Sequence, residues 1–206
     1  MIELFLSAFA TFFVVIDPPG CAPIFASLTA GTPTSHRRTM ALRSIAVAST
    51  ILLIFAIFGE DLLRTLGISL EAFRIAGGIM LFLIALEMVF EKRQERRETR
   101  AEDVKSKPEH EDISIFPMAI PMIAGPGSIA SAMLLMARSE GVQASLVVLG
   151  ALAAVLVLTL VSLLLAGPLM KLVGYKVEAM ISRILGVLLA ALAVQFVIDG
   201  VRTSFA

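Results

Sequence analysis

The alternation of apolar and polar stretches along the chain predicts six membrane-spanning helices. Apolar stretches long enough to cross the ~30 Å hydrocarbon core of a bilayer recur throughout the 206 residues. We place the spans near Ile2–Leu28, Ala41–Leu63, Leu70–Phe90, Ile113–Ala137, Val142–Met170 and Val177–Val201. The pattern therefore predicts an all-α membrane protein.

Two of these spans contain residues that an unbroken helix does not tolerate. The first is interrupted by Asp17-Pro18-Pro19-Gly20-Cys21-Ala22-Pro23, and the fourth by Ala124-Gly125-Pro126-Gly127-Ser128. Proline removes a backbone donor and clashes with the carbonyl four residues back. In hydrocarbon each unpaired backbone group costs several kcal/mol, so a break is tolerated only where protein or a water-filled cavity covers it. Both breaks are therefore predicted to be sites.

The uncharged part of the third span is too short to cross the hydrocarbon core. Only Ile75–Leu86 is free of charge, and a helix of that length rises roughly 18 Å. Glu71, Arg74 and Glu87 are therefore expected to snorkel to the interface, to face protein or to line a cavity.

The chain resembles itself weakly at an offset of 107 residues. The shift superposes Ser7 on Ser114, Phe9 on Phe116, Pro19-Gly20 on Pro126-Gly127 and Glu71-Ala72 on Glu178-Ala179. A repeat of three spans must enter the membrane from the opposite face in its second copy. We predict two inverted three-helix repeats, 1–90 and 113–206, whose first helices (the first and fourth spans) are broken, joined by a charged cytoplasmic linker at 91–112. Inverted repeats with broken helices in corresponding positions are typical of secondary transporters.

Charge is concentrated in the linker. Fifteen of the 34 acidic and basic residues lie between Glu91 and Asp112, and we interpret the segment as solvated, in part as a charged helix that extends the third span. A regulatory role is the alternative. With the amino terminus outside, 13 of the 17 lysines and arginines fall on the inner side, so the positive-inside rule places both termini on the outer side.

Composition excludes several classes of protein. The chain is 58% apolar, which is typical of a multi-pass membrane protein. The single cysteine, Cys21, excludes an internal disulfide, and we expect it to be a packing residue. No Cys/His cluster has metal-ligand spacing, and basic residues do not interleave with aromatic ones as in nucleic-acid binders. No cleavable signal peptide is expected at the start, and no cofactor is predicted.

The two interrupted segments resemble a known family. Asp17-Pro18-Pro19-Gly20 with Pro23-Ile24-Phe25, followed by Pro121 and Gly125-Pro126-Gly127-Ser128, is similar to the MarC family, also called the neutral amino acid transporter family. The resemblance covers nearly the full length. It implies a protein of the bacterial inner membrane that takes up small neutral amino acids such as glycine, alanine or serine. The family usually has asparagine in place of Asp17 and a single proline in place of Pro18-Pro19.

We predict that the two breaks together hold one small amino acid near the membrane midplane. Unpaired amides at the start of a half-helix and its macrodipole favour the carboxylate, and carbonyls freed by the prolines favour the ammonium group. The predicted substrate-binding residues are Asp17, Pro18, Pro19, Gly20, Cys21, Ala124, Gly125, Pro126, Gly127 and Ser128.

Two carboxylates are candidates for coupling to a proton or a sodium ion. Asp17 directly before Pro18 is the expected cap of a half-helix, but an intramembrane carboxylate is also rarely idle; the two roles are compatible. Glu87 is expected to be a snorkelling or paired carboxylate, with a proton relay as the alternative.

Other functions remain as alternatives. A channel would need a continuous polar lining, and the spans hold few polar residues. Export of other small metabolites or drugs is the second alternative. A membrane enzyme is the least favoured and we predict none, because Ser128 has no histidine within its span and Asp17 alone is no acid–base pair. Membrane lipid is the expected surroundings, and an oligomer is compatible with the sequence.

Overall fold

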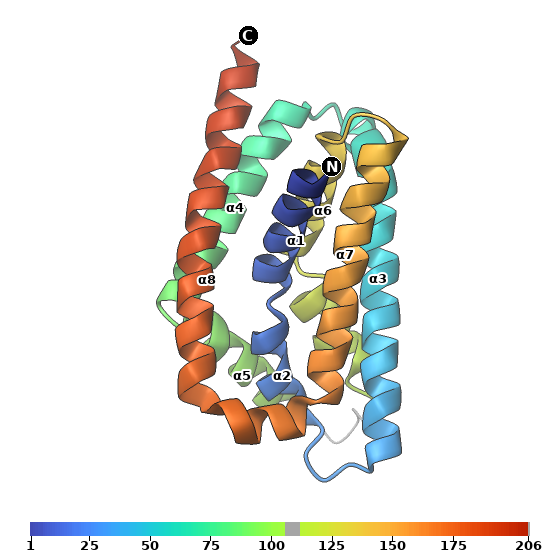
Figure 1. Ribbon diagram of the computed structural model, residues 1–206, viewed down its shortest axis with the longest axis vertical. Helices are drawn as coiled ribbons and strands as arrows, with labels where there is room; N and C mark the ends of the chain where they lie inside the picture. The colour runs from blue at the N-terminus through green and yellow to red at the C-terminus, as the bar shows by residue number, and fades with distance from the viewer. Residues whose placement is uncertain (106–111, 206) are drawn as a thin grey trace.

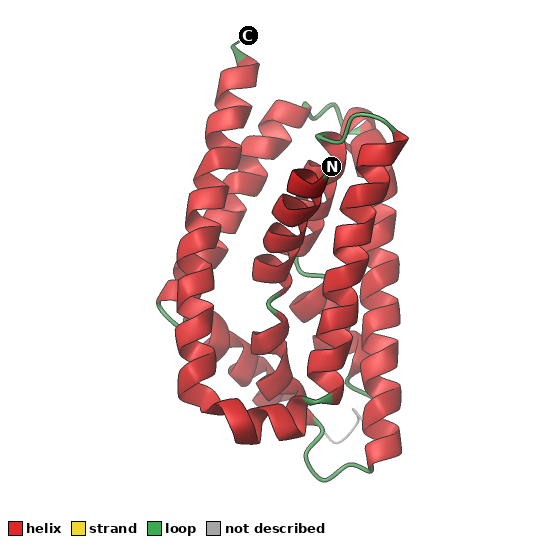
Figure 2. Ribbon diagram, viewed as in Figure 1, coloured by secondary structure: helices red, strands yellow, loops and turns green. Residues whose placement is uncertain are grey.

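The computed structural model describes residues 1–105 and 112–205, and the described residues form helices joined by short loops (Figure 2). The first half contains α1 (Ile2–Ile16), α2 (Pro18–Leu28), α3 (Thr34–Thr65) and α4 (Leu70–Val89). The linker contains α5 (Lys92–Lys105). The second half contains the irregular helical segment η1 (Ser114–Ile123), then α6 (Pro126–Ala137), α7 (Val142–Leu164) and α8 (Ala166–Ser204).

The helices form an elongated bundle with both termini at one end (Figure 1). α4 and α8 pack along each other on one side, and α3 and α7 contact each other on the other side. The interrupted pairs α1–α2 and η1–α6 lie between these two sides (Figure 1). α5 lies at the end opposite the termini, where it contacts α2 and α4.

Many side chains exposed on the long helices are large and apolar, which suits contact with lipid. Five helical segments are long and apolar enough to cross a membrane, and the bent pair η1–α6 supplies a sixth. Large exposed side chains such as Phe58, Leu83 and Val157 lie on these segments. The all-helical membrane class predicted from the sequence is therefore confirmed for the described residues.

Both predicted interruptions are present. α1 ends at Ile16 because Asp17 takes a left-handed backbone conformation (φ 59°, ψ 66°), and α2 begins at Pro18. η1 and α6 meet at 124–125 with a bend of 53°. η1 is also irregular internally, since Phe116 and Ile120, which each precede a proline, have extended backbone angles.

The boundary between the fifth and sixth spans was predicted wrongly. α7 ends at Leu164, and α8 runs from Ala166 to Ser204, through the segment expected to be a loop at 171–176. Pro168 lies in the first turn of α8, where a helix tolerates proline. The first turns of α8 cross the lower end of the bundle before the helix turns along α4 (Figure 1).

The linker contains the charged helix that we expected, but this helix does not continue α4 and it buries part of one face. Glu91 has a positive φ of 60°, and the chain turns there from α4 into α5. On α5, the side chains of Arg97 and Ala101 are only 5% and 3% exposed. Residues 106–111 of the linker lie outside the described part of the chain.

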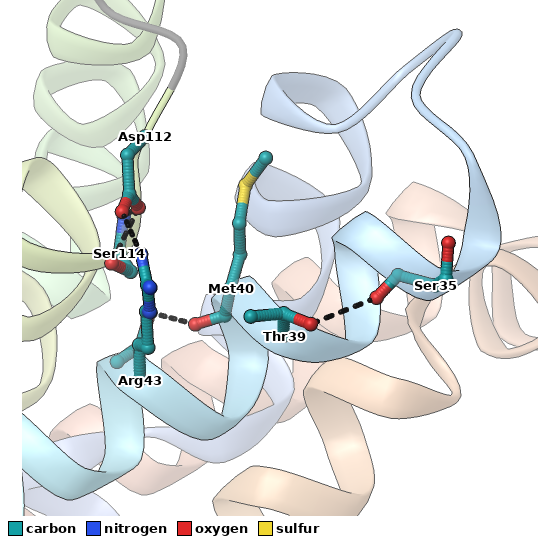
Figure 3. A network of polar contacts seen from close by, with 7 residues as sticks. Ser35, Thr39, Met40, Arg43, Asp112 and Ser114 are labelled. Atoms are coloured by element: carbon teal, nitrogen blue, oxygen red, sulfur yellow. Dashed lines mark hydrogen bonds and ion pairs between the residues drawn. The ribbon is translucent and has the colours of Figure 1, made fainter.

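A polar network ties the end of the linker to α3 (Figure 3). Arg43 of α3 donates a hydrogen bond to Asp112 Oδ2 at 2.8 Å, and the Ser114 amide donates to Asp112 Oδ1 at 2.9 Å. The hydrogen bonds from Ser114, and then the Arg43 guanidinium, lower the pKa of Asp112 below its usual value. Asp112 thus fixes the start of η1 beside α3.

Candidate functional site

Asp17 caps the half-helix α2. Its carboxylate Oδ1 accepts a hydrogen bond from the Gly20 amide at 3.1 Å, which satisfies one of the amides that a helix start leaves without an intrahelical partner. The capping role predicted for Asp17 is therefore confirmed. The start of α2 already has a carboxylate of the protein at its positive end.

The second oxygen of Asp17 pairs with an arginine of the linker. Arg97 Nη1 lies 2.9 Å from Asp17 Oδ2, and the two side chains are only 6% and 3% exposed. Gly20 makes this approach feasible, because a Cβ added there would lie 2.8 Å from Arg97 Nη1 and would also strike the Asp17 carboxylate. Gly20 thus leaves room for a buried ion pair, and its amide bonds to Asp17 instead of being available to a solute.

Arg93 satisfies a carbonyl that a proline leaves without a donor. The helical partner of the Val15 carbonyl would be the amide of Pro19, which has no N–H. Arg93 Nη2 donates to this oxygen at 2.7 Å, and Arg93 Nη1 contacts Met88 Sδ at 3.1 Å. Burial, and then the neighbouring Arg97, lower the pKa of Arg93 to about 10, so the side chain remains a cation at neutral pH.

The second break differs because the described residues show no side-chain hydrogen bond that caps its half-helix. α6 begins at Pro126, with Gly125, which has no side chain, in the capping position. Gly127 allows α6 to approach α1 and α4 closely: a Cβ there would lie 2.6 Å from Ile84 Cδ1 and 3.2 Å from Val15 Cγ1. Val15 precedes Asp17 by two residues, so the two breaks are neighbours.

A cavity of about 330 Å³ lies at this junction, at the small end of the ~300–1,000 Å³ usual for ligand sites. The cavity is lined by charged side chains, by apolar side chains and by the start of α6. The lining residues are Val15, Met80, Leu83, Ile84, Glu87, Arg93, Arg96, Arg97, Pro121, Met122, Gly125, Pro126, Gly127 and Ser128.

The cavity is lined by three arginines and one glutamate. Arg96 pairs with Glu87 at 2.7 Å; the Glu87 side chain is 24% exposed and that of Arg96 is 67% exposed. A small, partly open site of this charge can bind a solute through an anionic group. Among the described residues, no group of three or more His, Cys, Asp or Glu side chains could hold a metal ion.

The residues predicted from the sequence divide into two groups. Gly125, Pro126, Gly127, Ser128 and Glu87 line the cavity. The other predicted residues do not: Asp17, Pro18, Gly20, Cys21 and Ala124 are buried, and Pro19 is half-buried.

Sequence reasoning missed Arg93, Arg96 and Arg97, although a signal was present. Prolines at 18 and 19 leave carbonyls that need donors, and Arg93, Arg97 and Ala101 are spaced four residues apart, so they share one face of a helix. Nothing in the sequence indicated that this face returns to the first break.

The fold and this site define a multi-pass helical membrane protein in which two interrupted helices meet at a small charged cavity. Residues 2–205 match the model of the MarC family integral membrane proteins, and the chain belongs to this family.

Relatives of similar length occur in archaea and bacteria. The chain is 36% identical to a UPF0056 membrane protein of Methanocaldococcus jannaschii over 98% of this chain and 97% of the relative. It is 32% identical to the UPF0056 membrane protein YvbG of Bacillus subtilis, over 100% of this chain and 97% of the relative. It is 33% identical to the UPF0056 inner membrane protein YhgN of Escherichia coli, over 96% and 95%. No solved structure matches the chain.

Proposed function

We propose that the protein is a secondary transporter that moves small neutral amino acids of the glycine, alanine and serine class across the inner membrane by alternating access. The cavity at the bend between η1 and α6 is the observation that carries this proposal. It combines the arginines of α5, the carboxylate of Glu87 and the start of α6, for which the described part of the chain provides no side-chain cap. A zwitterion needs both signs of charge, and a small site excludes large side chains by volume.

The proposed transport cycle uses the two halves of the chain as inverted repeats. Each half consists of an interrupted pair followed by two long helices, α1–α2 with α3 and α4, then η1–α6 with α7 and α8. In such transporters, rocking of one repeat against the other exposes a central site to each side in turn. The charge distribution supports a topology with both termini on the outer side.

For coupling to a proton or a sodium ion, Glu87 is the stronger of the two candidates. Its carboxylate lines the cavity and keeps some exposure, whereas Asp17 is engaged by Arg97 and by the Gly20 amide. We propose that Glu87 exchanges its Arg96 partner for a cation or for the solute ammonium group. Glu87→Gln is then expected to abolish the effect of an imposed proton gradient on uptake.

The test is uptake and counterflow of labelled glycine, alanine and serine in proteoliposomes, with and without a proton gradient. We expect Gly127→Leu to abolish transport, because its side chain must enter the space between Ile84 and Val15. Gly150→Leu on α7 is the matched control, because a Cβ there meets nothing within 4 Å. Size-exclusion chromatography verifies that both variants are folded.

Two results would reject the transporter. The first is absence of uptake and counterflow for all three amino acids in the unaltered protein. The second is stepwise single-channel current in planar bilayers, since a carrier shows none and the cavity would then be part of a pore.

A further inference from the structure

The three arginines around the cavity differ in their partners. Arg97 pairs with Asp17 and Arg96 pairs with Glu87. Arg93 instead donates to two neutral acceptors, the Val15 carbonyl and the Met88 thioether. The cavity lining therefore carries a surplus positive charge, and the chemistry of the contacts assigns this surplus to Arg93.

Arg93 is also placed to contact a bound molecule. Its side chain is half-buried and lines the same cavity as Gly127 and Ser128 in the first turn of α6. A guanidinium has five N–H donors in a planar fork that matches a carboxylate. Its bond to Val15 holds it in place at the first break.

We propose that Arg93 binds the carboxylate of the transported solute and thereby restricts the site to solutes that carry one. The inference rests on the proposed function, since it names a recognition element of the same cavity. The first-turn amides of α6 add to the attraction for an anion. Glu87 accepts the ammonium group of an amino acid, so an amino acid satisfies both ends of the site.

The test measures binding rather than transport, by isothermal titration calorimetry of the purified full-length protein in detergent. Three solutes separate the two charged groups: alanine has both, propionate has only the carboxylate, and alaninamide has only the ammonium group. The variants are Arg93→Gln, Arg93→Lys, and Lys92→Gln as the control. Lys92→Gln removes one positive charge from an exposed neighbouring position of the same helix.

We expect the unaltered protein to bind alanine and propionate, and to bind alaninamide at least about 10-fold more weakly. Arg93→Gln is expected to weaken alanine and propionate by roughly 10-fold to 100-fold, the usual effect of a lost hydrogen bond between charged groups. Arg93→Lys should bind with an intermediate affinity because it keeps the charge and loses the fork. Lys92→Gln should bind like the unaltered protein.

Equal binding of alanine and alaninamide by the unaltered protein would overturn the inference, even if Arg93→Gln did not fold. So would unchanged propionate affinity in folded Arg93→Gln or Arg93→Lys. These results are separate from the transport assay. If uptake occurs but binding does not depend on Arg93, the proposed transport function is kept and the carboxylate site is rejected. If binding depends on Arg93 but no uptake occurs, the carboxylate site is kept and the transport function is rejected.

Discussion

At the scale of single residues, the first break is held together by one buried ion pair. Removing two charges from water is costly, and only a close partner with further hydrogen bonds offsets the cost. Asp17 and Arg97 meet this condition, because Asp17 also accepts the Gly20 amide. Loss of either residue removes the ion-pair partner of a buried charge.

Asp17→Asn and Arg97→Gln are therefore expected to destabilise the protein strongly as single variants. Breaking a buried pair from one side costs about 3–5 kcal/mol, although asparagine retains the ability to cap α2. The double variant removes both charges of the pair, so its loss of stability should be smaller than the sum of the two single losses. The unfolding temperature in detergent, detected by the onset of aggregation, is measured for the unaltered protein and the three variants. Together they form a double-mutant cycle.

An exposed pair provides the control for this cycle. Arg64 and Glu60 are one helical turn apart on α3, and their side chains are 74% and 61% exposed. Exposed pairs contribute little to stability, so Glu60→Gln should leave the unfolding temperature nearly unchanged. Additive losses in the Asp17 and Arg97 cycle would show that the two residues do not depend on each other.

Residue chemistry predicted the breaks but not their partners. The prolines and the aspartate specify locally where α1 ends and how α2 begins. Which side chain reaches the Val15 carbonyl or the Asp17 carboxylate depends on how the chain folds back, 78 and 80 residues later in sequence. That distance removes the partner from any local pattern.

At the scale of elements, α5 is an amphipathic helix whose buried face carries cations. Arg97 and Ala101 are buried one turn apart, while Glu95, Glu98 and Thr99 are exposed. The high charge of the linker concealed this face, because hydrophobic periodicity cannot register a stripe made of arginine and alanine. α5 thus supplies charged side chains to the wall of the cavity.

Ala101→Asp is expected to detach α5 from α2. Ala101 is 3% exposed and borders a second cavity with Pro23 and Ile24 of α2, so an aspartate there would bury a charge at a cost of several kcal/mol. Each 1.4 kcal/mol is tenfold in an equilibrium, and proteolysis of an opened segment follows that equilibrium. Limited trypsin cleavage after the α5 arginines should accelerate by at least about tenfold.

Thr99→Asp is the matched control, since the same carboxylate enters the same helix at an exposed position. It should leave the cleavage rate close to that of the unaltered protein. If Ala101→Asp and Thr99→Asp were cleaved equally fast, the docking of α5 would not depend on its buried face.

At the scale of the whole molecule, different contacts join the helices at the two ends of the bundle. At the end away from the termini, Arg97 of α5 pairs with Asp17 at the first break. At the end with the termini, Arg138 after α6 pairs with Asp199 of α8, and its guanidinium lies 4.6 Å from the centre of the Phe196 ring. Burial lowers the pKa of Arg138, and the Asp199 carboxylate opposes that shift. The alternating-access cycle that we propose requires the contacts at these two ends to separate in turn.

Loss of the Arg138–Asp199 pair should therefore favour opening at the termini. Ser128→Cys in a Cys21→Ala background places the single thiol of the chain in the cavity lining. A membrane-impermeant maleimide applied from the termini side should label it several-fold faster when Asp199→Asn is added, because a shift of ~1 kcal/mol between two states is a factor of about five. Labelling of Ser204→Cys near the carboxyl terminus shows on which side of the membrane the termini lie. We expect the maleimide to label it in intact cells, as for a terminus on the outer side.

Glu140→Gln is the control for this shift, because it removes one exposed carboxylate two residues after Arg138. Its labelling rate should match that of the Ser128→Cys parent. In Asp199→Asn, faster labelling from the termini side should be accompanied by slower labelling from the α5 side, since the two openings are mutually exclusive in alternating access. Faster labelling from both sides would instead indicate a pore through the bundle and would contradict the carrier.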